Sequence, residues 1–248
     1  MFKSKKIVKK KSLADNTIKQ AVILCGGLGT RLGKITKTTP KPLIKIGKEP
    51  FLNSLIERLA KYRLDKILLL CSYKSNKFFK KYHNKKINNF TKIICIDEKK
   101  PLGTGGALIN AKNKLANYFY LLNGDTYFDG DLLQLNENFN KKKFDVIIST
   151  KKIYNTRYGA IKEKNNIIQE FDNCTKKKRS NINLGTYIVK KNILKKFKKE
   201  PLSFENDILP ILVKKKKVQC SFFPKNFFLD IGVNSDLKKA KYILPKIK

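Results

Sequence analysis

The sequence has few of the residues on which common hydrolytic and redox sites depend. Its only histidine, His83, lies in a polar, lysine-rich stretch, so no Ser-His-Asp arrangement can be argued from it. The five cysteines are scattered, and none forms a CxxC pair with another. Cysteines in or just after apolar runs are typical of small core residues in a reduced cytosolic protein.

Long hydrophobic runs are absent as well. No segment approaches the roughly 18 apolar residues of a membrane-spanning helix. The lysine-rich N-terminus lacks the apolar stretch that follows in a secretory signal peptide. We therefore expect a cytoplasmic protein without a membrane partner.

Acidic residues are also few, with 19 aspartates and glutamates against 56 lysines and arginines and a formal net charge of +37. Polybasic surfaces attract nucleic acids. Here the lysines are spread along the whole chain, and they do not interleave with aromatic residues as a base-stacking surface requires. We interpret the charge as a compositional bias on solvated faces and expect no specific nucleic acid partner.

The order of apolar runs is typical of one α/β domain, for which 248 residues suffice. Residues 1–19 are polar and basic, and we predict a flexible extension there and a single domain at 20–248. Over residues 20–145, apolar runs alternate with helical patterns, which predicts a mostly parallel sheet covered on both faces. Residues 146–248 are richer in strand-like runs.

Periodicity and length place the individual elements. Strands are predicted at residues 21–25, 67–71, 92–97, 118–122, 146–150, 159–162, 167–171, 183–189 and 218–223, and helices at 51–62, 75–83, 205–214 and 235–244. A glycine turn is predicted at 103–106, followed by a helical stretch to Leu115.

A glycine-rich loop at residues 24–33 directly follows the first apolar run. Glycines after a strand let backbone amides approach a phosphate group and point at it. The spacing does not fit the dinucleotide fingerprint, because three residues instead of two separate Gly29 from Gly33. It does not fit a P-loop either, because Leu28 stands where the first glycine of that motif belongs.

Arg31 lies inside this loop, and Lys41 follows ten residues later between two prolines. The pattern Gly-Gly-x-Gly-Thr-Arg followed by Pro-Lys-Pro-Leu resembles the nucleotidyltransferases that join a nucleoside triphosphate to a sugar 1-phosphate. The resemblance runs from Gln20 to Pro245. It implies a Rossmann-like α/β fold with a mixed, mostly parallel sheet, in which residues 20–145 bind the nucleotide and 146–248 form a β-rich sugar-binding half.

The resemblance also implies roles for residues of the loop. Arg31 would grip the triphosphate through its planar guanidinium, and Lys41 would act as a movable point charge near the reacting phosphates. The nucleotide-binding residues expected in the loop are Leu24, Cys25, Gly26, Gly27, Gly29, Thr30 and Arg31.

Asn123-Gly124-Asp125 ends the apolar run at 118–122, and open α/β sheets bind their ligands at such strand ends. A carboxylate there suits Mg²⁺, which takes one or two carboxylates together with phosphate oxygens and waters. Asp230, an acidic residue within an apolar stretch, is the expected second ligand. We therefore predict Mg²⁺ as the cofactor, and Arg31, Lys41, Asp125 and Asp230 as the catalytic residues.

Glu98 follows another apolar run and precedes the glycines at 103–106. The resemblance implies that a loop at this place holds the base, so we expect Glu98, Gly103 and Thr104 to bind the nucleotide. The Glu98 carboxylate could accept hydrogen bonds from N1 and N2 of guanine. A solvated glutamate in a turn is the alternative.

Four later segments, at residues 157–160, 181–185, 204–207 and 228–232, make the resemblance closest to the D-glycero-α-D-manno-heptose 1-phosphate guanylyltransferases. They imply that Gly159 and Asn183 face the sugar. Where many relatives carry a Glu-Lys pair, this chain has Asp172-Asn173-Cys174, and residues 176–179 are candidates for the missing positive charge.

The expected reaction transfers GMP from GTP to this heptose 1-phosphate and releases pyrophosphate. Mannose, glucose or N-acetylmuramic acid 1-phosphate as the acceptor and UTP, CTP or dTTP as the donor stay open. A nucleotide-sugar sensor on the same fold is the non-enzymatic alternative, and assembly into a homo-oligomer also stays open.

Overall fold

The structure, a computed structural model of the chain, describes residues 17–155, 158–172, 178–198 and 201–246. Most of the predicted N-terminal extension at residues 1–19 lies outside these ranges. Ile18 is nevertheless buried in the core, and the carbonyl oxygen of Lys19 accepts a hydrogen bond from the amide of Asp65 (2.8 Å). The packed part of the chain therefore includes the residues just before Gln20.

The predicted strands and helices form, with different ends. The strands are β1 (Gln20–Leu24), β2 (Lys45–Ile46), β3 (Glu49–Pro50), β4 (Lys66–Cys71), β5 (Lys86–Ile87), β6 (Thr91–Asp97), β7 (Tyr118–Asn123), β8 (Thr126–Phe128), β9 (Val146–Asn155), β10 (Ala160–Lys164), β11 (Ile167–Asp172), β12 (Lys178–Lys190), β13 (Val218–Phe222) and β14 (Phe228–Asp230). The α-helices are α1 (Lys34–Thr38), α2 (Phe51–Ala60), α3 (Ser75–Tyr82), α4 (Gly103–Asn110), α5 (Leu132–Glu137), α6 (Leu209–Lys214) and α7 (Asn234–Ile243). Short helical turns include η2 (Thr30–Leu32), η3 (Lys41–Leu43), η4 (Lys112–Lys114), η5 (Lys191–Lys196), the π-helical turn η6 (Phe204–Ile208) and η7 (Leu244–Lys246).

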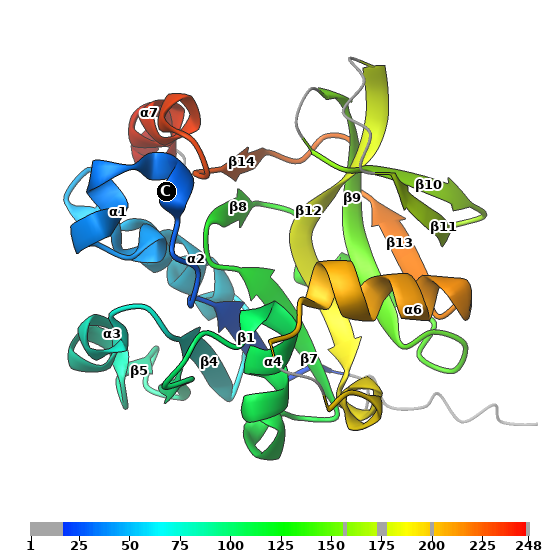
Figure 1. Cartoon of the computed structure of the whole chain (residues 1–248), viewed down its shortest axis with the longest axis horizontal. Coiled ribbons are helices and arrows are strands. Elements are labelled where there is room, and N and C mark those ends of the chain that lie inside the picture. The colour runs from blue at the N-terminus through cyan, green and yellow to red at the C-terminus, as the bar shows by residue number, and fades with distance from the viewer. Residues whose placement is uncertain (1–16, 156–157, 173–177, 199–200, 247–248) are drawn as a thin grey trace, which may run out of the picture.

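Ten of the strands form one central sheet in the order β10-β11-β13-β9-β12-β7-β1-β4-β6-β5 (Figure 1). The neighbours β7, β1, β4 and β6 are parallel. In the other half, β12 is antiparallel to both β7 and β9, while β13 and β9 are parallel. The expected α/β fold with a mixed sheet is confirmed, and its parallel part is concentrated in the first half.

The sheet has a hydrophobic core on each face, because successive strand residues point to opposite sides. In β1, Ala21 and Ile23 pack in the core that includes Leu55 of α2, whereas Val22 packs in the core that includes Leu108 of α4. Figure 1 shows α4 and α6 in front of the sheet and α2 behind β1. Burial on both faces explains the nearly continuous apolar runs of β1, β4 and β7.

The prediction of a glycine turn at residues 103–106 is wrong, because helix α4 begins at Gly103. The amides of Gly105 and Gly106 both donate to the carbonyl oxygen of Leu202, at 2.7 and 3.0 Å. A Cβ atom at Gly105 would come within 3.0 Å of that oxygen. The glycines therefore serve a close helix-to-loop contact, which local turn chemistry does not reveal.

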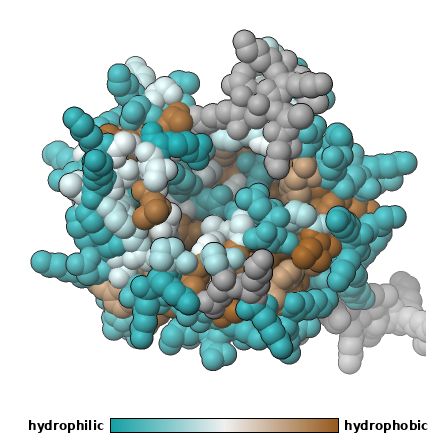
Figure 2. Space-filling view, viewed as in Figure 1, coloured by the Kyte–Doolittle hydropathy of each residue, from teal (hydrophilic) through white to brown (hydrophobic). Residues whose placement is uncertain are grey.

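Hydrophilic residues surround the face of the molecule shown in Figure 2, and paler and apolar residues lie toward its hollowed middle. Within the described ranges, no helix combines the length and apolar character needed to cross a membrane.

Candidate active site

A cavity of about 330 Å³ opens where β1 and β7 end, and we call it the first cavity. Its wall includes the start of the glycine loop, the segment that follows β6 and the Asn123-Gly124-Asp125 turn. The predicted nucleotide-binding residues that line it are Leu24, Cys25, Gly26, Gly27, Glu98, Gly103 and Thr104. Segments far apart in the sequence thus meet at one edge of the sheet, as the parallel strand order requires.

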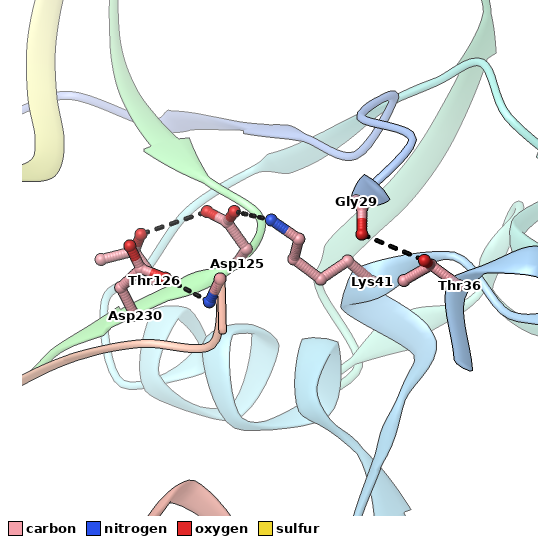
Figure 3. A network of polar contacts seen from close by, with 7 residues as sticks. Gly29, Thr36, Lys41, Asp125, Thr126 and Asp230 are labelled. Atoms are coloured by element: carbon pink, nitrogen blue, oxygen red, sulfur yellow. Dashed lines mark hydrogen bonds and ion pairs between the residues drawn. The ribbon is translucent and has the colours of Figure 1, made fainter. Parts of the chain in front are cut away.

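Gly29 brings the second half of the loop against Lys41. Its backbone is left-handed (φ 66°), a conformation that costs an ordinary residue free energy. A Cβ atom there would lie 2.9 Å from a methyl group of Thr36 and 3.2 Å from Cε of Lys41. The Thr36 hydroxyl donates to the Gly29 carbonyl oxygen (3.0 Å), which fixes the turn (Figure 3).

Lys41 and Asp125 form an ion pair at the mouth of this loop. The Lys41 ammonium lies 2.7 Å from Oδ2 of Asp125, and the lysine is 8% exposed. The hydroxyl of Thr126 contacts the other carboxylate oxygen of Asp125 (3.2 Å), so the carboxylate lies between the two side chains (Figure 3). Both oxygens of Asp125 are thereby oriented.

Asp230 is brought beside Asp125 by a two-stranded ladder that the sequence did not predict. Strand β14 pairs antiparallel with β8, which sets Asp230 opposite Thr126, and the amide of Ile231 donates to the Asp125 carbonyl oxygen (2.9 Å). The Asp230 carboxylate folds back to accept a hydrogen bond from the amide of Gly232. Asp230 therefore lies at the end of the ladder, and Asp125 directly precedes the strand that pairs with it.

Asp125 and Asp230 are the predicted ligands of a metal ion. Among the described residues, no group of three or more histidine, cysteine, aspartate or glutamate side chains is arranged to hold a metal ion. The two predicted ligands, Asp125 and Asp230, do line a common cavity, which Glu205 lines as well. Two carboxylates fit Mg²⁺, which completes its shell with substrate phosphates and water, and they do not fit a structural zinc site.

Glu98 lies in the wall of the first cavity and is 8% exposed. Burial, with a smaller contribution from the nearby Asp97, raises the pKa of Glu98 to about 7, although a hydrogen bond from the amide of Leu102 opposes the rise. Its Oε1 lies beside Gly26, where a Cβ atom would come within 2.8 Å of it. A solvated glutamate in a turn would keep an ordinary pKa. The burial and the raised pKa of Glu98 favour a functional residue in the cavity wall instead.

A second cavity of about 290 Å³ lies next to the first. The predicted sugar-binding residues Gly159 and Asn183 line it, together with Arg31, Asp125 and Asp230. The predicted catalytic residues except Lys41 therefore share this second cavity, and Lys41 lines the first.

Three predicted nucleotide-binding residues, Gly29, Thr30 and Arg31, do not line the first cavity. Gly29 and Thr30 lie beyond its wall, in and next to the turn η2, and Thr30 is exposed. Arg31 is also exposed and borders the second cavity instead. Two further predictions concern the segment 172–174, which replaces the Glu-Lys pair of many relatives, and residues 176–179, the candidates for the missing positive charge. Residues 173–177 lie outside the described part of the chain.

Sequence reasoning missed two residues that line both cavities, Asn123 and Glu205. Each stands in a segment that the motif comparison had marked, but neither had been given a role. Asn123 is the last residue of β7, one position before the turn that carries Asp125. Its position at a strand end was the signal that could have identified it.

Residues 20–246 match the family described as nucleotidyl transferase. The chain belongs to the nucleotidyl transferase family. The match covers both halves of the fold and both cavities, so the sequence-based assignment to the sugar-phosphate nucleotidyltransferases is confirmed. This nucleotidyltransferase is therefore an enzyme of the class to which its motifs pointed.

Individual relatives of this nucleotidyltransferase match it over nearly their full length. D-glycero-α-D-manno-heptose 1-phosphate guanylyltransferase from Campylobacter jejuni is 38% identical over 220 residues, which are 88% of this chain and 96% of that protein. The enzyme of the same name from Aneurinibacillus thermoaerophilus is 33% identical, over 90% of this chain and 96% of that protein. The crystal structure of HddC from Yersinia pseudotuberculosis complexed with GMP-PN has a TM-score of 0.77 and 33% identity, covering 93% of this chain and 100% of that chain.

Proposed function

We propose that this nucleotidyltransferase transfers GMP from GTP to D-glycero-α-D-manno-heptose 1-phosphate, and that it does so in the cytoplasm. The supporting observation is that two adjoining cavities share Asp125, so the phosphates of two substrates can meet at one carboxylate. The names of the two relatives favour this heptose and guanine. GTP would occupy the first cavity and the sugar phosphate the second.

The reaction needs positioning and charge neutralisation more than proton transfer. A phosphate oxygen of the sugar 1-phosphate attacks the α-phosphorus of GTP in line, and pyrophosphate leaves. Because the nucleophile is already an anion, no general base is required, and the main task is to hold two polyanions together. The amides of the glycine loop would seat the nucleotide phosphates.

Two cationic side chains, Lys41 and Arg31, would neutralise the negative charge of the reacting phosphates. In the free protein Lys41 is paired with Asp125 at 2.7 Å. We propose that Lys41 moves from Asp125 to the phosphates of GTP when the nucleotide binds, which its flexible stem permits. Arg31, exposed at the border of the second cavity, would close on the phosphates of the substrates.

Asp125 and Asp230 would hold Mg²⁺ in this account. When bound, the cation would neutralise the negative charge that the two substrates bring together. Movement of Lys41 away from Asp125 would leave that carboxylate able to bind the cation. The relatives' family generally uses a divalent metal, and the two adjacent carboxylates suit one.

We expect Glu98→Gln to weaken the use of GTP more than the use of UTP. The Glu98 carboxylate would accept hydrogen bonds from both N1–H and N2–H of guanine, whereas a glutamine amide offers one acceptor and one mismatched donor. A loss of roughly 10- to 100-fold in kcat/KM for GTP is expected. Steady-state pyrophosphate release with each nucleotide measures it, and equal losses for GTP and UTP would remove Glu98 from base recognition.

The affinity for GTP is also expected to fall as the pH decreases through about 7. The raised pKa of Glu98 means that its carboxyl becomes neutral below that value, and a neutral carboxyl cannot accept both guanine donors. The affinity should therefore be full above pH 7 and lost progressively below it. Titration with a fluorescent GTP analogue between pH 6 and 8 tests this, with Glu98→Gln as the control that should show no such dependence.

The substrate pair is tested by a matrix of four nucleoside triphosphates against heptose, mannose, glucose and N-acetylmuramic acid 1-phosphates, read by pyrophosphate release. The highest kcat/KM is expected for GTP with the heptose 1-phosphate. A higher value for another pair would reassign the substrates. Release with no pair at all would favour a nucleotide-sugar sensor on this fold.

A further inference from the structure

Glu205 lines both cavities, and the proposed phosphate chemistry does not use its carboxyl. It lies in the π-helical turn η6, directly before α6. Such turns are rare and occur frequently at functional sites. Burial raises the pKa of Glu205, and the nearby Asp125 adds to the rise. A half-buried carboxyl with a raised pKa at the junction of two substrate cavities is a candidate for a functional role.

The position of this carboxyl is fixed by the other half of the fold. The Thr104 hydroxyl donates to Oε2 of Glu205 (2.7 Å) and accepts a hydrogen bond from the amide of Phe204 (2.8 Å). The Thr104 hydroxyl can accept from that amide and donate its single hydrogen to Oε2 at the same time, so one hydroxyl makes both contacts. The contacts of Gly105 and Gly106 with the Leu202 carbonyl hold the two segments together. Glu205 is thus preorganised before any substrate binds.

The surroundings of Glu205 in the second cavity are suited to hydroxyl groups. Asn183 and Asn206 line the same cavity with amide donors and acceptors. The Asn183 amide is itself fixed, because it donates to the hydroxyl of the buried Tyr187 (2.6 Å) and accepts from the amide of Gly185 (2.9 Å). Tyr187 in turn opposes the rise in the pKa of Glu205.

Charge decides which part of a substrate can lie against Glu205. A phosphate group would be repelled by the carboxyl in its ionised form, whereas a hydroxyl can donate to a carboxylate with a strong, charge-assisted hydrogen bond. The cationic Arg31 borders the same cavity and offers the phosphate a favourable place. The cavity therefore has a polarity that would orient a sugar phosphate, with its hydroxyls toward Glu205.

We propose that Glu205 determines specificity for the acceptor, by accepting a hydrogen bond from a ring or side-chain hydroxyl of the sugar 1-phosphate in a geometry held by Thr104. This inference rests on the proposed function, because it takes the second cavity as the sugar site. It concerns whichever sugar 1-phosphate the wild-type enzyme uses best, and it does not depend on that sugar being a heptose.

The test compares the wild type with Glu205→Ala and the isosteric Glu205→Gln, using the preferred sugar 1-phosphate. We expect Glu205→Ala to raise the KM for the sugar phosphate by roughly 10- to 100-fold, and Glu205→Gln by a smaller factor in the same direction. The KM for the nucleotide should change by less than about threefold. Asp207→Asn is the matched control, since it removes the same charge from the same turn at a residue that lines neither cavity.

Deoxy analogues of the sugar phosphate separate a direct contact from a structural effect. The analogue that lacks the recognised hydroxyl should react poorly with the wild type but lose little more in Glu205→Ala, because the contact is already absent. Equal effects of the variant on every analogue, or an unchanged KM for the sugar phosphate in a folded Glu205→Gln protein, would overturn the proposal. If the substrate matrix gives no turnover at all, the proposed function fails before this comparison begins, so the two failures are distinct.

Discussion

Asp125→Asn is expected to reduce turnover by roughly a thousandfold or more while the fold survives. Asparagine keeps the shape of the side chain and can still contact the Thr126 hydroxyl. It removes the negative charge that pairs with Lys41 at 2.7 Å and that would hold Mg²⁺ between the two cavities. The measurement is steady-state pyrophosphate release at saturating substrates and Mg²⁺, with thermal unfolding as the check on the fold.

Asp145→Asn is the matched control for this variant. Asp145 also pairs with a lysine, Lys190 at 3.5 Å, but it lines neither cavity. Turnover of Asp145→Asn should stay within a few-fold of the wild type. Near wild-type, Mg²⁺-dependent pyrophosphate release by Asp125→Asn would contradict the metal assignment.

Lys41→Met is expected to lower kcat by roughly 100- to 1,000-fold, which is the usual effect of removing one preorganised group that stabilises a transition state. The methionine side chain has a similar length, so the tight contact with Gly29 can be retained while the charge is lost. Lys41→Arg should recover only part of the activity, because the broader guanidinium must fit at a site that leaves lysine 8% exposed. Rates under saturating substrates compare the three proteins.

Lys45→Met serves as the control for the loss of one positive charge nearby, since Lys45 is exposed on β2 and lines neither substrate cavity. It should keep a kcat close to that of the wild type. A Lys41→Met enzyme with unchanged kcat and a raised KM for GTP would assign Lys41 to ground-state binding and remove it from the transition state.

The sequence predicted the parts of the site that depend on local pattern. Strand ends in a parallel sheet share one edge, so the glycine loop after β1, Glu98 after β6 and Asp125 after β7 could be placed together from their order alone. The structure brings residues of all three segments into the wall of one cavity. Their chemical roles stay predictions until the variants are measured.

The parts that sequence reasoning missed depend on contacts between distant segments. Strands β8 and β14 have three residues each, too few for a periodic signal, yet their pairing is what sets Asp230 beside Asp125. The local sequence around Glu205 predicts only an ordinary helix residue. Its carboxyl is held in place by Thr104, which is 101 positions away in the sequence. The glycines of α4 were misjudged for the same reason, since Leu202 determines their role.

In the proposed reaction, a sugar 1-phosphate attacks the α-phosphorus of a nucleoside triphosphate at one carboxylate-lined junction of two cavities. The most direct measurement follows the α-phosphate label of [α-³²P]GTP during incubation with Mg²⁺ and D-glycero-α-D-manno-heptose 1-phosphate. We predict that the label appears in a nucleotide-sugar in a one-to-one ratio with released pyrophosphate, and only when the sugar phosphate is present. Pyrophosphate release without the acceptor, or label that stays in GTP with every sugar 1-phosphate tried, would contradict the account.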